Sequence, residues 1–241
     1  MTGSVVRRLL RDTSGVAMLE FAWTMPIVLA IGAYGVEISN LAMLNLRVSQ
    51  IALNLADNAS RVGVYNTLST QQLREVDMND VLQAVRLQGN NIELTTRGRV
   101  TISSLENVKR TYADGTSDSG PIQRIHWQRC MGQKSGTGYD SSYGTTPSTA
   151  GTDLTQGNAG WVAPNGMGDP NRMVTAPPDS AIMFVEVNYL TKPLFGTMLL
   201  SPTRIHYVAS FIVRDRRDFQ QIYNPVATPT TPRSTCDLHN S

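Results

Sequence analysis

Glu20 is the residue whose type and position in this sequence raise the clearest chemical question. It is the one charged residue between Val16 and Val36, in a run that is otherwise apolar or uncharged. At the centre of a membrane helix such an acid costs about 3 kcal/mol unless a positive group compensates it. A cut before Val16 would create that group, because the new ammonium terminus could neutralise Glu20 of an adjacent subunit. Alternatively, Glu20 lies near the lipid headgroups and its side chain reaches water.

Cys130 and Cys236 are the two cysteines of the chain. Two thiols exclude a disulfide-dense scaffold and a cysteine-rich zinc module. In an oxidising compartment, a bond between them would close a loop of roughly 100 residues and stabilise the fold by up to about 4 to 5 kcal/mol. We expect this internal bond; an intermolecular bond or free thiols are the alternatives.

The other residue types that commonly carry catalysis follow no recognisable pattern. His126, His206 and His239 occur singly, without the spacing of a metal site. We expect His126 and His206 to be ordinary surface or half-buried residues. The sequence contains no G-x-S-x-G elbow, P-loop or dinucleotide fingerprint. We therefore predict that the protein is not an enzyme and binds neither a metal nor a cofactor.

The apolar run from Val16 to Val36 is long enough to cross a bilayer, because 21 helical residues span about 30 Å. Arg7, Arg8 and Arg11 precede it. The positive-inside bias therefore predicts a cytoplasmic N-terminus and an exported chain after residue 40. The alternative is a cleaved secretory signal. The run is longer than such a signal requires, and small-residue cleavage options such as Ile31-Gly32-Ala33 lie inside it.

The residues at the start of this run resemble the processing site of type IV prepilins. A short basic leader ends in Gly15 and is followed by small or apolar residues, then by Glu20 and Phe21. Pro26 lies a few residues on, and Glu37 lies near the end of the run. With these features, the segment over residues 8–40 most resembles the TadE-like pseudopilins of tight-adherence (Flp) pilus systems.

This resemblance implies a role for each residue of the motif. A prepilin peptidase would remove the leader, residues 1–15, so that Gly15 precedes the cut and Val16 becomes the new terminus. Glu20 would pair with a neighbouring subunit, and Phe21 would be its aromatic neighbour. Major pilins of these systems usually have tyrosine at the Phe21 position and are much shorter, so this 241-residue chain is similar to the minor pilins.

The first helix is predicted to continue beyond the membrane. Apolar residues recur after the span in alternating steps of three and four, as in a heptad seam. They are Leu41, Leu44, Val48, Ile51, Leu55 and Val62, with the polar Asn58 at the one missing position. We expect one helix over residues 16–61, with a transmembrane part at 16–38 and a continuation at 39–62, ended by Gly63. The seam packs either on the chain's own domain, which we favour, or on neighbouring subunits.

A second helix and a sheet are predicted within a domain over residues 63–222. The helix is expected from Thr70 to Leu87, capped by Ser69 or Thr70, with Asp77–Asp80 as a point where it could be interrupted. Alternating apolar residues predict strands. These segments are 91–94 and 100–102, joined by a hairpin at Arg97-Gly98, and 122–130, 182–190 and 205–214. We expect an α+β fold in which helices cover one face of an antiparallel sheet of four or five strands. The resemblance independently suggests a pilin-like fold.

Two segments lack such periodicity. Residues 131–180 are rich in glycine and serine and predict a long surface loop, which is either an exposed recognition segment or a flexible insertion. Residues 223–241 are rich in proline and threonine and predict an extended tail. A bond at Cys236 could tie this tail down.

The function expected from these observations is that of a minor pilin or pseudopilin subunit in tight-adherence pilus assembly and surface adhesion. The chain would lie in the inner membrane with its domain in the periplasm. Its partners would be other pilins and pseudopilins, the prepilin peptidase and the pilus assembly platform. The net charge of +2 gives no sign of nucleic-acid binding. The alternative is a membrane-tethered adhesin or binding protein that never enters a fibre.

Overall fold

A computed structural model of the chain describes residues 14–65, 70–225 and 230–239. It contains two compact units. The first comprises Met1–Met43 with Lys192–Pro202, and the second comprises Leu44–Thr191 with Thr203–Ser241. Most of the predicted leader, the predicted cap residue Ser69 and parts of the predicted tail lie outside the described residues.

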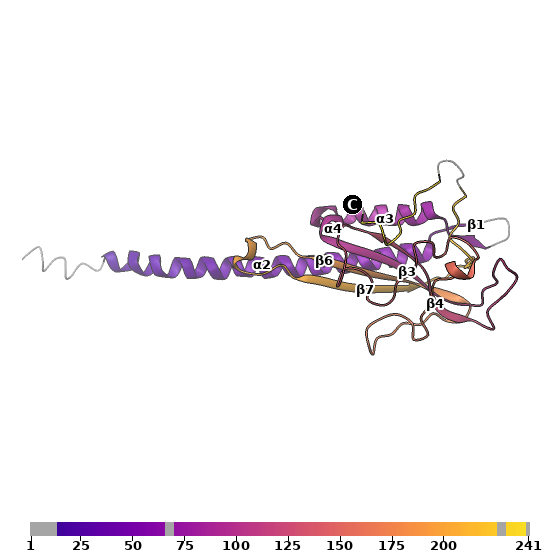
Figure 1. Cartoon of the computed structure of the whole chain (residues 1–241). Helices are drawn as coiled ribbons and strands as arrows, with labels where there is room; N and C mark the ends of the chain where they lie inside the picture. Colours follow the sequence, from indigo (N-terminus) through magenta and orange to yellow (C-terminus); the bar gives the residue numbers. More distant parts are fainter. Residues whose placement is uncertain (1–13, 66–69, 226–229, 240–241) are drawn as a thin grey trace, which may run out of the picture. The chain divides into compact units, whose positions relative to one another are not determined.

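The predicted first helix is present as α2, Ser14–Arg61 (Figure 1). It runs through Pro26 without interruption. It ends just before Gly63, whose φ of 149° is a conformation that other residues rarely adopt. A Cβ atom at this position would also lie 2.7 Å from the Gln71 side chain. The predictions of one continuous helix and of its end at Gly63 are both confirmed.

The second half of α2 packs on its own domain. Leu44, Val48, Ile51 and Leu55 of the heptad seam are buried in the larger hydrophobic core of the second unit. The favoured interpretation of the seam, packing within the chain, is therefore confirmed for these four positions.

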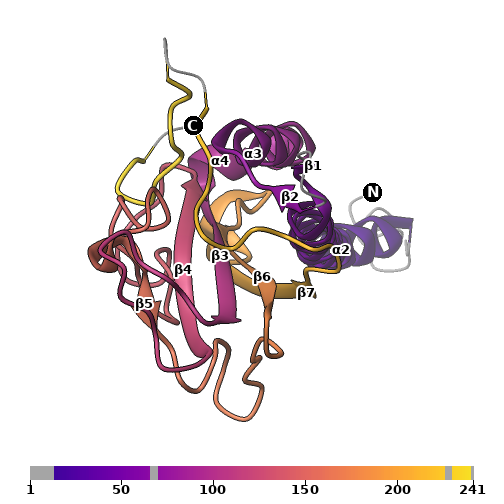
Figure 2. The ribbon, with the colours of Figure 1, turned by 90° about the vertical axis from the view of Figure 1, so that its right-hand side faces the viewer.

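Five antiparallel strands form the main sheet of the second unit, in the order β5-β4-β3-β6-β7 (Figure 2). They are β3 Gly98–Val108, β4 Ile122–Met131, β5 Trp161–Val162, β6 Ser180–Leu190 and β7 Arg204–Ile212. The central strand β3 pairs with both β4 and β6. A separate two-stranded sheet joins β1, Val64–Tyr65, to β2, Gln71–Gln72. The predicted α+β class is confirmed, and the three later strand predictions agree with β4, β6 and β7 to within two residues.

A β-bulge interrupts the alternation of β4 at His126. Ser104 of β3 pairs with Trp127, and the next residue, Leu105, pairs with Ile125, so that His126 is the additional residue. Trp127 belongs to the larger hydrophobic cluster and Ile125 to the smaller one, although they are two positions apart on one strand. The bulge therefore exchanges the faces to which odd and even residues of β4 point.

Both faces of the sheet are covered. On one face, Met183 and Val185 of β6 belong to a cluster that includes residues of α2 and of α3, Glu75–Gly89. On the other face, Phe184 packs with Ala163 and Met167 of the long loop. The sequence predicted one buried face, and the second is buried because the loop folds back over it.

The second helix begins later than predicted. Residues 71–72 form strand β2, and α3 begins only at Glu75. Asp77 does not interrupt the helix, because it lies in its first turn and stabilises it. Its carboxylate accepts a hydrogen bond from the Arg74 backbone N–H at 3.0 Å and from the Arg74 guanidinium at 2.6 Å. A carboxylate near the helix N-terminus also interacts favourably with the helix dipole.

The predicted hairpin at Arg97-Gly98 is wrong. A 3-10 turn, Asn90–Ile92, and a short helix α4, Leu94–Arg97, occupy the first predicted strand. Glu93 between them has a φ of 55°, which reverses the chain. Ile92 and Leu94 are both buried in the core, but they belong to the 3-10 turn and to α4 and not to a strand.

The long loop over residues 131–180 follows a packed course. It contains β5 and a 3-10 turn, Gln156–Asn158. Gln128 of β4 donates to the Gly144 carbonyl at 3.0 Å and accepts from the Thr146 N–H at 2.9 Å. The buried Glu186 carboxylate of β6 accepts a hydrogen bond from the Ser141 hydroxyl. These contacts hold the loop on the sheet face.

Candidate functional site

The residues of the prepilin-like motif lie together at the start of α2. Gly15 and Val16 are in its first turn, and Glu20 and Phe21 follow about one turn later. All four are exposed. The structure thus presents the predicted processing and assembly residues on one accessible helical segment. It does not describe residues 1–13, so the recognition of the leader lies outside the described residues.

The first part of α2 is apolar on all sides and almost entirely unburied. It is the one helix among the described residues that is long and apolar enough to cross a membrane. Its exposed large side chains point in every direction around the axis; they include Met18, Leu19, Trp23, Ile27, Val28 and Ile31. A helix that is apolar on all sides is stable when lipid or other helices surround it. The segment is therefore suited to single-pass anchoring in a membrane.

Glu20 is the charged interruption in this apolar surface. Its carboxylate forms no ion pair or side-chain hydrogen bond with the part of the chain that the structure describes. Because an isolated carboxylate in an apolar environment is strongly disfavoured, a cationic group from elsewhere would stabilise it.

Glu37 is the other acid of α2 within the first unit, and its environment is different. Only 2% of its surface is exposed. The Leu194 N–H donates to both carboxylate oxygens, at 3.1 and 3.0 Å, and the Phe195 N–H donates to one of them at 3.2 Å. Glu37 thus fixes the segment between β6 and β7 to the helix. This contact could not be predicted from the sequence, because the partners are backbone groups 157 and 158 residues away.

The disulfide between Cys130 and Cys236 is present, with the Cα atoms 4.8 Å apart. Further contacts hold the tail beside it. The Cys130 N–H donates to the Ser234 carbonyl at 2.7 Å. The buried Arg99 guanidinium donates to the carbonyls of Cys236 and of Leu238, the latter at 2.7 Å. The tail is therefore docked along the described residues 230–239, as the expected bond implied.

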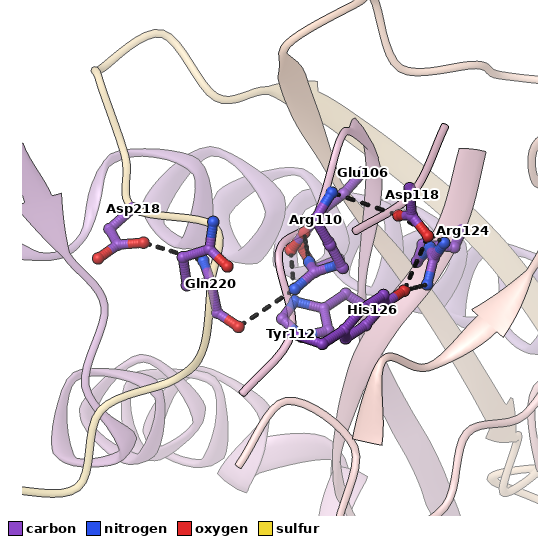
Figure 3. A network of polar contacts seen from close by, with 9 residues as sticks. Glu106, Arg110, Tyr112, Asp118, Arg124, His126, Asp218 and Gln220 are labelled. Atoms are coloured by element: carbon purple, nitrogen blue, oxygen red, sulfur yellow. Dashed lines mark hydrogen bonds and ion pairs between the residues drawn. The ribbon is translucent and has the colours of Figure 1, made fainter. Parts of the chain in front are cut away.

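A buried polar network lies where β3 ends and β4 begins (Figure 3). Glu106 forms an ion pair with Arg110 and contacts the His126 Nδ1 at 3.0 Å. Arg124 is bound by Asp118 at 3.0 Å. His126 is fully buried, so the expectation that it lies at the surface or half-buried is wrong. The β-bulge explains the difference, since it turns His126 inward beside Glu106.

The pKa values of His126 and Glu106 are both lowered. Burial lowers the pKa of His126 below 6.5, and the charges of Arg110 and Arg124 lower it further, while Glu106 opposes the shift. Burial by itself would raise the pKa of Glu106, but His126 and Arg110 outweigh it, and the net pKa is lowered. The network thus pairs Glu106 with Arg110 and places the His126 Nδ1 within hydrogen-bonding distance of the same carboxylate. It connects β3 to β4, and the side chains of Glu106, Arg110, Arg124 and His126 are buried.

Two other buried arginines have structural roles. Arg129 of β4 donates to the Glu75 carboxylate at the start of α3, with Nε at 2.9 Å, and both side chains are completely buried. Arg217 donates to the carbonyls of Ala59, Ser60 and Val62 at the end of α2. Burial lowers the pKa of Arg217 to about 10. Arg217 satisfies carbonyls at the end of α2, and Arg129 is the buried partner of Glu75, whose carboxylate also lies 3.5 Å from the Arg233 Nε.

Within residues 14–65, 70–225 and 230–239, no group of three or more His, Cys, Asp or Glu side chains is arranged to hold a metal ion. His206 is exposed, in agreement with the expectation that it lies at the surface or is half-buried. Comparisons of the chain with protein families, with curated proteins and with solved structures found no match.

Proposed function

We propose that the chain is a TadE-like minor pilin or pseudopilin that functions by association in tight-adherence pilus assembly and surface adhesion. In this proposal it inserts with its N-terminus in the cytoplasm, is cut after Gly15 and keeps its domain in the periplasm. Its partners are the inner membrane, the prepilin peptidase, other pilins and the assembly platform. The prepilin-like residues of the sequence are its first support.

The observation that carries the proposal is the exposed N-terminal part of α2 with one unpaired acid. An anchor requires only an apolar helix, and Glu20 weakens an anchor by about 3 kcal/mol if it stays uncompensated at membrane depth. A subunit that pairs Glu20 with the new terminus of a neighbour would remove that cost. In parallel helices, the four-residue spacing between Val16 and Glu20 corresponds to an axial shift of about 6 Å.

The N-terminal sequence of the mature chain tests the processing step. A chain that begins at Val16 supports prepilin cleavage. A chain that keeps Met1, or that begins after Ala33, contradicts it. The control is Gly15→Leu, which should leave the leader attached, because a bulky side chain replaces the small residue before the cut.

Replacing Glu20 by Ala separates a pilin from a tethered adhesin. A pilin with Glu20→Ala should still be cleaved before Val16 and still form the Cys130–Cys236 bond, but should fail to enter fibres. A tethered adhesin should keep its binding activity. Glu20→Asp is the matched control, since it keeps the charge. Fibres of normal number from Glu20→Ala cells would contradict the proposed pairing.

A further inference from the structure

The segment between β6 and β7 has an unusual surface. Residues 193–203 contain no charged residue. Three large apolar side chains of this segment point into the surroundings: Leu194 is 59% exposed, Phe195 48% and Met198 88%. Leu199 and Leu200 are partly exposed. So much exposed apolar surface in a short loop indicates a surface that binds a membrane or another protein.

Glu37 sets the position of this loop along the helix. It follows directly after the apolar run Val16–Val36, which is roughly 30 Å long at 1.5 Å per residue, the same as the thickness of the hydrocarbon core of a bilayer. The end of the run therefore coincides with the boundary between acyl chains and headgroups. The bonds from Leu194 and Phe195 to Glu37 hold the loop at that level.

We propose that the loop Lys192–Pro202 is a second membrane contact, in which Leu194, Phe195 and Met198 insert into the lipid interface beside the helix. The inference rests on the proposed membrane anchoring and adds to it a lipid-binding site that does not span the bilayer. Lipid is the occupant because the loop belongs to the same compact unit as the membrane-length helix and continues its apolar surface at one end.

The buried state of Glu37 agrees with this position. A carboxylate at a lipid boundary is costly unless it is hydrogen-bonded. Backbone N–H groups of the loop supply these bonds, and the loop in turn uses the carboxylate to satisfy N–H groups that lipid could not. Helix and loop thus satisfy one another's polar groups at Glu37, while Leu194, Phe195 and Met198 remain exposed.

Fluorescence of a labelled full-length chain in lipid vesicles tests the proposal. The two native cysteines are bonded to each other, so Met198→Cys provides a single reactive thiol for an environment-sensitive label. We expect blue-shifted emission that lipids brominated on their acyl chains quench and that aqueous iodide does not. Val28→Cys, within the span, is the positive control. Leu87→Cys, an exposed apolar position on α3, is the negative control.

The outcomes distinguish this inference from the anchoring on which it rests. Lipid quenching at Val28 with iodide quenching at Met198 would overturn the loop contact and leave the anchor intact. Absence of lipid quenching at Val28 would overturn both. Protection at Met198 that disappears on dilution of the protein in lipid would assign the loop to a contact between copies, which also overturns the inference.

A substitution of Glu37 tests its positioning role. In Glu37→Ala vesicles, lipid quenching at Met198 should fall towards that of the Leu87 control, because the loop loses its attachment to the helix. Quenching at Val28 should stay unchanged. Glu37→Gln keeps one acceptor oxygen and should give an intermediate value. Equal quenching at Met198 in all three proteins would refute the role of Glu37.

Discussion

Removal of the Cys130–Cys236 bond should lower the free energy of unfolding of the second unit by about 5 kcal/mol. The two cysteines are separated by 106 residues. The loop-entropy relation gives a stabilisation of about 5 kcal/mol for a loop of this length at 25 °C. Because a small domain is stable by only about 5–15 kcal/mol, the bond accounts for a large part of the total.

The folded structure should survive the change, because the bond is not the only attachment of the tail. Arg99 still donates to the carbonyls of Cys236 and Leu238. In Cys130→Ser/Cys236→Ser, the hydroxyl at position 130 can still interact with Thr101, whose Oγ1 lies 3.2 Å from the Cys130 sulfur. The loss of stability should therefore come mainly from the greater freedom of the unfolded chain.

Urea unfolding of the detergent-solubilised full chain measures the effect. Trp127 is buried in the core and reports the transition. The oxidised wild type should unfold at a higher urea concentration than both the reduced wild type and the double-serine protein, which should agree with each other. Reductant should not change the double-serine protein. Equal midpoints for oxidised and reduced wild type, with equal slopes, would refute the reasoning.

Three further predictions concern buried ionisable side chains. Arg129→Met should destabilise the domain by about 3–5 kcal/mol, because it leaves Glu75 buried without this partner; the double variant Glu75→Leu/Arg129→Met should lose much less in the same urea assay. The folded-state pKa of His126 lies below 6.5, so the unfolded chain binds the proton first and stability should fall as the pH drops below 6.5. The slope contributed by His126 should reach at most about 1.4 kcal/mol per pH unit and should be absent in His126→Gln. Arg217→Leu should cost about 1–3 kcal/mol by leaving the last carbonyls of α2 unsatisfied, with faster amide exchange in its last turn; unchanged exchange there would contradict the capping role.

The elements with long, regular patterns could be predicted from the sequence. Helix α2 is defined by an apolar run followed by a heptad seam, and β6 and β7 by repeated β-branched and aromatic residues. In each case many residues contribute to one period, so that single exceptions do not change the assignment.

The errors arose where few residues carried the pattern. Ile92 and Leu94 satisfy the two-residue period of a strand but lie in successive turns on either side of Glu93, whose left-handed conformation no neighbouring residue predicts. Strand β5 has two residues, too few for any period. At His126 a bulge adds one residue to β4. The residues before and after it therefore do not follow one regular alternation between the two faces of the sheet.

The candidate site was predictable in part. A sequence motif can identify Gly15, Val16, Glu20 and Phe21, because they lie close together in the chain. In the structure they lie on one exposed segment. The loop bound to Glu37 was not predictable, because its polar contacts use backbone N–H groups that carry no sequence signature. Its apolar residues alone would also fit a buried core.

The disulfide also determines how the chain can be divided. Residues 130–236 form a covalent ring that contains β5, β6, β7 and the long loop, while α2, α3 and β3 lie outside it. One cut inside the ring, for example in the loop over residues 131–180, opens it without releasing a fragment. Strands β6 and β7 would stay covalently attached to β3 and β4 through the disulfide, and a protease acting there would leave the oxidised protein in one piece until a reductant reached the bond.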